Sequence, residues 1–302
     1  MEEKKSIFKK IHNDGFTWHD SIFTIFLLFL FVFIVTQIIE SNALGAVVRA
    51  FPGIVDDGFW SLFVMYAATI VTWICFGGYC LITKYNRFIL KASGTQEKGN
   101  TIKMLLLGLL IGFGENAFGI LAAVIHGDIH LTFEGCSVLG LIVMFIAVFV
   151  QSSSEEFVCR GFLYQRLRKG YRSPWVAIIG NAVIFMSLHL FNPGISLVPI
   201  LHLVAIALFY SLFVYYFDSI WLPMAAHAAW NFTQNIIFGL PNSGIVSTFS
   251  IWKLEAARGD ISFIYDPFFG VEGSAFLLIT TVIGMVIVIV LGEKKKRKAI
   301  EA

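Results

Sequence analysis

The sequence predicts an all-α fold, a polytopic membrane bundle of about eight transmembrane helices. Of its 302 residues, 57% are hydrophobic and only 14% are charged, and the mean hydropathy is +0.79. This composition lies well outside the usual balance of a water-soluble domain. The chain also contains roughly eight apolar stretches that approach the ~20 residues a spanning helix needs. They lie near residues 20–40, 59–83, 104–125, 136–157, 174–191, 198–217, 221–240 and 273–292.

The spanning elements are expected to be helices within a single membrane domain, 1–302. The short alternating segments of a membrane barrel are absent from the sequence. The first apolar stretch is too long for a cleavable signal and has no small-residue cleavage site. We find no repeat, low-complexity linker or nucleic-acid-binding motif, and the four cysteines show no CxxC spacing that would indicate a metal site or a disulfide framework.

The distribution of cations predicts how the chain is oriented in the bilayer. All but three of the 22 Lys and Arg residues precede the first predicted span or follow the second, fourth and last spans. Lys4, Lys5, Lys9 and Lys10 form the first of these groups, and a final group follows at 294–298. Positive charge favours the cytoplasmic side, so we expect an integral, multi-pass membrane protein with cytoplasmic N- and C-termini.

Two adjacent carboxylates lie at the end of the fourth apolar stretch, in SSSEEFVCR. On a helix, Glu156 and Arg160 share a face at i and i+4, whereas Glu155 points about 100° away. The pattern predicts a structural Glu156–Arg160 pair beside a free carboxylate. The alternative from this segment alone is that Glu155 extends to cytoplasmic water, with Arg160 marking the interface.

Two later stretches supply further polar groups. VIFMSLHLFN places His189 one turn after Phe185, and PMAAHAAWNF places His227 and Asn231 at i and i+4 among alanines. A lone membrane histidine is often only a hydrogen-bonded core residue. However, polar groups within spans usually face a protein interior or a water-filled cavity. A carboxylate, two imidazoles and an amide around one cavity would supply a general base, a second proton acceptor and oxyanion donors, which suits amide hydrolysis.

The chain contains three motifs in sequence order: EExxxR at 155–160, FxxxH at 185–189 and HxxxN at 227–231. In these motifs and their order it resembles the CPBP family, the CAAX prenyl proteases and bacteriocin-processing (Abi) proteases. The resemblance covers a catalytic core of about 150–235. It implies an intramembrane endopeptidase in which Glu155 and His189 activate water, while His227 and Asn231 stabilise the oxyanion. The implied partners are the lipid bilayer and a membrane-associated peptide or protein, either a CAAX-type prenylated protein or a bacteriocin-related peptide.

Three questions stay open in the sequence. If each span simply crossed the bilayer in turn, His189 would lie about 22 Å from Pro174, deeper than Glu155. A membrane-embedded turn at 191–198, a tilted fifth helix or an extended fourth helix would each bring them level. We expect no cofactor, with zinc held by Glu155, His189 and His227 as the alternative.

The rival functions are a non-catalytic immunity or scaffold protein and, less favoured, a proton-coupled transporter, for which no paired repeats are visible.

Overall fold

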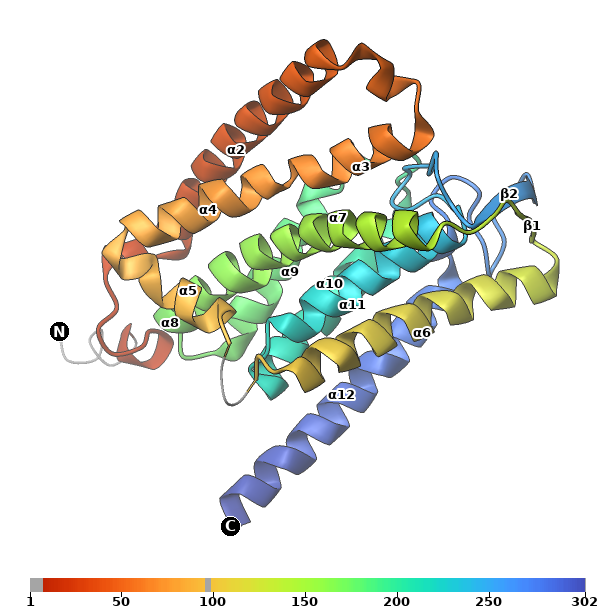
Figure 1. The fold of residues 1–302 in the computed structure, drawn as a ribbon. Helices are drawn as coiled ribbons and strands as arrows, with labels where there is room; N and C mark the ends of the chain where they lie inside the picture. Colours follow the sequence, from red (N-terminus) through yellow and green to blue (C-terminus); the bar gives the residue numbers. More distant parts are fainter. Residues whose placement is uncertain (1–7, 96–98, 302) are drawn as a thin grey trace.

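The computed structural model describes residues 8–95 and 99–301 and shows a bundle of long helices (Figure 1). Lys4, Lys5 and Lys98, which contribute to the orientation argument, lie outside the described residues. Within the described part, six helical segments are long and apolar enough to cross a membrane. They are Ile22–Ala50 (α2), Gly58–Ile82 (α3, Gly58–Ala68, and α4, Ile70–Ile82), Ile102–His126 (α6), Val138–Gly170, Leu197–Phe217 (α10) and Ala275–Lys298 within α12 (Ala275–Glu301). The all-α membrane bundle predicted from the sequence is therefore confirmed.

The remaining two predicted spans correspond to shorter helices. The stretch near 174–191 forms α9 (Pro174–Leu188), and the stretch near 221–240 forms α11 (Trp221–Asn231), which continues as a π-helix, η5 (Phe232–Ile237). Short helices can lie inside the bundle because their neighbours, and not lipid, contact their ends. Every residue of α11 after Trp221 is buried.

The fourth apolar stretch is longer than predicted. Helix α7 (Val138–Glu156) continues without a break through a π-helix, η4 (Phe157–Leu163), into α8 (Tyr164–Gly170). Counted at about 1.5 Å per residue, Glu155 lies about as far from Gly170 as His189 lies from Pro174. The extended fourth helix, one of the three arrangements considered above, thus brings Glu155 level with His189.

Helix α11 packs very closely against α6, as the alanines around His227 suggest. A Cβ atom on Gly112 would lie 2.0 Å from the Ala226 carbonyl oxygen, and one on Gly108 would lie 2.3 Å from that of Leu222. Neither position can carry a larger residue without moving the backbone. The two glycines form the small-xxx-small pattern that allows membrane helices to approach each other, and the contact fixes the helix that carries His227 and Asn231.

The shorter elements lie at the ends of the bundle. They are α5 (Arg87–Ser93), the 3-10 turns η1 (Trp18–Asp20), η2 (Pro52–Val55), η3 (Lys84–Asn86) and η6 (Val271–Gly273), and two strands, β1 (Ile129–Phe133) and β2 (Trp252–Ala257). The strands pair antiparallel, with Phe133 opposite Trp252. This small sheet, which the sequence did not predict, joins the α6–α7 connection to the segment before α12 (Figure 1).

Candidate active site

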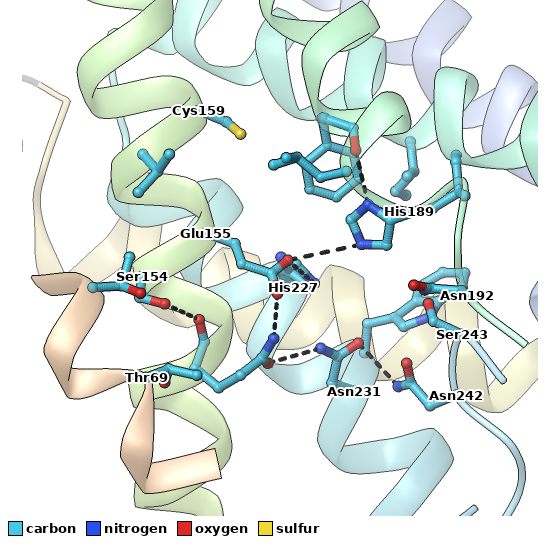
Figure 2. A pocket seen from close by; sticks show the side chains of 18 of the residues that line it. Thr69, Ser154, Glu155, Cys159, His189, Asn192, His227, Asn231, Asn242 and Ser243 are labelled. Atoms are coloured by element: carbon cyan, nitrogen blue, oxygen red, sulfur yellow. Dashed lines mark hydrogen bonds and ion pairs between the residues drawn. The ribbon is translucent and has the colours of Figure 1, made fainter. Parts of the chain in front are cut away.

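Residues from all three motifs line one cavity of about 300 Å³ between the helices (Figure 2). Glu155 projects into it from the last turn of α7, with a third of its side chain exposed. Its Oε2 lies 4.0 Å from Nε2 of His189 and 3.9 Å from Nε2 of His227. Its Oε1 accepts a hydrogen bond from Gln151, one turn earlier on the same helix. The structure therefore brings Glu155 and both histidines together.

His189 is positioned by the end of α9. It caps the C-terminus of this helix, and its Nδ1 lies 2.8 Å from the Phe185 carbonyl oxygen. A carbonyl oxygen can only accept, so Nδ1 carries the proton in this contact. In the neutral ring, Nε2 then presents a lone pair towards Glu155, as a proton acceptor requires.

Glu156 and Arg160 form the predicted pair, at 2.8 Å, and both side chains are completely buried. The guanidinium also donates to the Ala207 carbonyl oxygen at 2.9 Å and lies 4.6 Å from the centre of the Phe185 ring. The alternative in which Arg160 marks the water interface is wrong, because the helix continues beyond it to Gly170 and Arg160 is enclosed by the bundle.

The Glu156 carboxylate has a second contact that the motif does not reveal. Its Oε1 lies 3.0 Å from Nδ1 of His227. Because this oxygen already accepts from Arg160, it acts as a carboxylate acceptor and the imidazole Nδ1–H donates to it. Consequently, the Nε2 atom of His227 can donate a hydrogen bond only when the ring carries both protons.

Asn231 lines the cavity one turn after His227, but its amide is already hydrogen-bonded. Nδ2 donates to Ser152 Oγ at 3.1 Å and to Gln151 Oε1 at 3.3 Å, and Oδ1 accepts from Asn242 at 3.0 Å. The amide is therefore attached to the turn of α7 that precedes Glu155.

Sequence reasoning missed several polar residues of this site, among them Gln151, Ser152, Asn242 and Glu272. Gln151 contacts both Glu155 and Asn231. A signal for it was available, since it is a polar residue at i−4 of Glu155 in an otherwise apolar run. Asn242 and Glu272 come from the segment between α11 and α12, and no periodicity there indicates which residues face the cavity.

The zinc alternative can be tested against the distances. Zinc holds nitrogen and oxygen ligands at about 2.0–2.1 Å in a tetrahedron, so neighbouring ligand atoms lie roughly 3.3–3.4 Å apart. The carboxylate-to-imidazole separations of 3.9 and 4.0 Å are wider than this. Among residues 8–95 and 99–301, no group of three His, Cys, Asp or Glu side chains is arranged to hold a metal ion. This arrangement does not fit zinc, and we derive no step through a metal.

Other polar residues of the bundle, including His202 at the cavity wall, have structural partners. Asn116 of α6 donates to Gln234 at 2.7 Å, and Glu115 accepts from Thr281 of α12 at 2.7 Å. His202 contacts the same Thr281 hydroxyl at 3.1 Å. The Thr281 hydroxyl thus connects α12 with α6 and α10, and the Asn116 contact connects α6 with η5.

The fold and the site thus place a carboxylate and two imidazoles at one cavity in an apolar helical bundle. Residues 137–233 match the family model described as Type II CAAX prenyl endopeptidase Rce1-like, over about a third of the chain. This match supports the family that the three motifs indicate, the CAAX proteases, over these residues, and with it an intramembrane protease. No curated protein and no solved structure matched the chain.

Proposed function

We propose that this protein is an endopeptidase that hydrolyses a peptide bond of a membrane-associated substrate, and that Glu155 activates the attacking water. The observation that carries this proposal is the pair of 3.9 and 4.0 Å gaps between Glu155 Oε2 and the two imidazole Nε2 atoms. These gaps are too long for direct hydrogen bonds. Two atoms that share a water molecule at ~2.8 Å from each lie about 4–4.5 Å apart. A water hydrogen-bonded to Glu155 can therefore also reach an imidazole, and this water is the proposed nucleophile.

In the proposed reaction, Glu155 removes a proton from this water while the water oxygen bonds to the substrate carbonyl carbon. His189 can take this proton from Glu155 and relay it, because its Nδ1–H is committed to Phe185 and its Nε2 faces the same space. The proton then passes to the substrate nitrogen, the C–N bond breaks, and a carboxylic acid and an amine leave. No metal is required in this sequence of steps.

The oxyanion formed in the attack would be stabilised by His227 and Asn231. For His227 this requires a doubly protonated ring, which the Glu156 carboxylate at 3.0 Å favours electrostatically. For Asn231 it requires that Nδ2 exchange Ser152 and Gln151 for the substrate oxygen. The proposed roles thus predict that substrate binding rearranges the Asn231 amide.

Comparison of membranes that contain the wild-type protein or Glu155→Gln would test the proposal. Mass spectrometry of peptide termini should find new termini only with the wild type, and they would identify the substrate as prenylated or bacteriocin-related. Purified wild-type protein should then cleave a peptide that spans the site, and Glu155→Gln should not. Identical sets of termini would contradict a protease and favour the immunity or scaffold role.

A further inference from the structure

A second carboxylate lines the same cavity, and the proposed reaction does not use it. Glu272 precedes α12, and only 6% of it is exposed. Its Oε2 accepts from the Trp230 indole N–H at 3.3 Å, and its Oε1 accepts from the Ser243 backbone N–H. Donors directed at both oxygens match an ionised carboxylate, which is a pure acceptor.

Both of these donors are neutral, and the cationic groups available among the described lining residues are histidines, of which His227 acts on Glu272 without forming an ion pair with it. Among its lining residues in the described part of the chain there is no Lys or Arg, and no ion pair within 4.0 Å involves Glu272. The buried guanidinium of Arg160 forms its ion pair with Glu156 and not with Glu272. Glu40 and Glu155 add two more carboxylates to the lining. A buried charge without a counter-charge is costly, and burial raises the pKa of the Glu272 carboxyl to about 7. A bound cation would remove this cost.

Glu272 is also held at a fixed place relative to the reacting groups. Its partner Trp230 lies on the same turn of α11 as His227 and Asn231. Its other partner, Ser243, adjoins Asn242, whose amide donates to Asn231 Oδ1 at 3.0 Å. A group bound by Glu272 would therefore be held at a defined distance from a peptide bond placed beside Glu155.

We propose that Glu272 determines substrate specificity by binding a lysine or arginine side chain of the substrate, a fixed number of residues from the cleaved bond. This inference rests on the proposed peptidase function and specifies its substrate class. A glutamate, an aspartate or a free C-terminal carboxylate at the same substrate position would meet a like charge and bind poorly. The site selects a basic peptide segment over an acidic one.

The test measures binding apart from cleavage, in purified Glu155→Gln protein. The probes are fluorescent, lipid-anchored peptides in which one lysine, glutamine or glutamate is moved through successive positions. At one position, lysine should bind at least about tenfold more tightly than glutamine, and glutamate more weakly than either. Adding Glu272→Gln should abolish this preference. Adding Glu40→Gln, the same change at another lining carboxylate, should leave most of it.

Absence of a lysine preference at every position would overturn the inference. So would an equal loss of preference with Glu40→Gln, which would indicate a diffuse acidic field. If Glu272→Gln does not fold, Glu272→Asp is the second variant: its carboxylate keeps the charge but lies one methylene further from the substrate. The binding preference should then shift from lysine to the longer arginine. An unchanged preference would also overturn the inference. Cleavage by protein with Glu155 intact is measured in parallel: lysine-dependent binding without cleavage would contradict only the peptidase function.

Discussion

Replacement of each member of the Glu155–Glu156 pair by glutamine should have opposite effects on activity and stability. Glu156→Gln leaves the guanidinium of Arg160 completely buried without a counter-charge. Breaking a buried pair typically costs about 3–5 kcal/mol. The glutamine carbonyl, the Ala207 carbonyl oxygen and the Phe185 ring remain as partners for the guanidinium, so we expect a loss of about 2–3 kcal/mol.

Glu155→Gln changes a side chain that is a third exposed and whose direct partner is the neutral Gln151. A glutamine can keep that hydrogen bond, so stability should change by less than about 1 kcal/mol. Activity should be abolished, because the proton acceptor for water is lost. Glu156→Gln should retain partial activity, since its carbonyl oxygen can still accept the Nδ1–H of His227.

Thermal unfolding in detergent, followed by intrinsic fluorescence, measures the difference. At about 2–4 °C per kcal/mol, Glu156→Gln should lower the Tm by about 4–12 °C, and Glu155→Gln by less than about 4 °C. As a control, Arg160→Met combined with Glu156→Gln removes both charges and should restore much of the lost stability. Equal Tm losses for the two single variants, or an active Glu155→Gln, would refute the assignment of a catalytic role to Glu155 and a structural role to Glu156.

Three further outcomes follow from the site and the loops. Activity should survive exhaustive chelation, and elemental analysis should find far less than one zinc per chain; activity that is lost and then restored by stoichiometric zinc would reverse this view. His189→Gln should remove most activity at all pH values, whereas His227→Gln and Asn231→Ala should each lose about 10²–10³ in rate and together less than the product; multiplicative losses in steady-state rates would count against a shared oxyanion. Although burial opposes it, hydrogen bonds from Ser262 and His126 and the charge of Arg258 lower the pKa of Asp128. The carboxylate should therefore stabilise the loops at pH values above its unfolded pKa of about 4, and lose this effect as the pH falls through the lower folded value. Thermal unfolding of Asp128→Asn against wild type should show a difference at pH 7 that shrinks towards pH 3; a constant difference would exclude this linkage.

The helical bundle and the residues of the three motifs could be predicted because both depend on local pattern. Apolar length identifies spans, and the i, i+4 spacing of Glu156 and Arg160 gives their contact directly. The contact between Glu156 and His227 could not be predicted, because it joins two helices whose mutual rotation is set by packing. The placement of α11 itself depends on its close approach to Gly108 and Gly112 of α6, whose missing side chains leave no hydrophobic signal.

The part of the cavity formed by Asn242 and Glu272 could not be predicted from the sequence for a different reason. These residues lie in an irregular segment where turns and backbone hydrogen bonds, not a helical or strand period, decide which side chains face inward. Orientation in the bilayer and the boundaries of the catalytic core remain predictions.

Each π-helix begins directly after a motif residue, η4 after Glu156 and η5 after Asn231. A π-turn contains about one residue more than an α-turn, so it is equivalent to a single-residue insertion that the helix has absorbed. Upstream of it, Glu155 and His227 keep their angular phase; downstream, every side chain is rotated relative to an uninterrupted helix. A comparison of this chain with uninterrupted α-helices would therefore place Glu155 and His227 correctly and assign the residues after each π-helix to the wrong face.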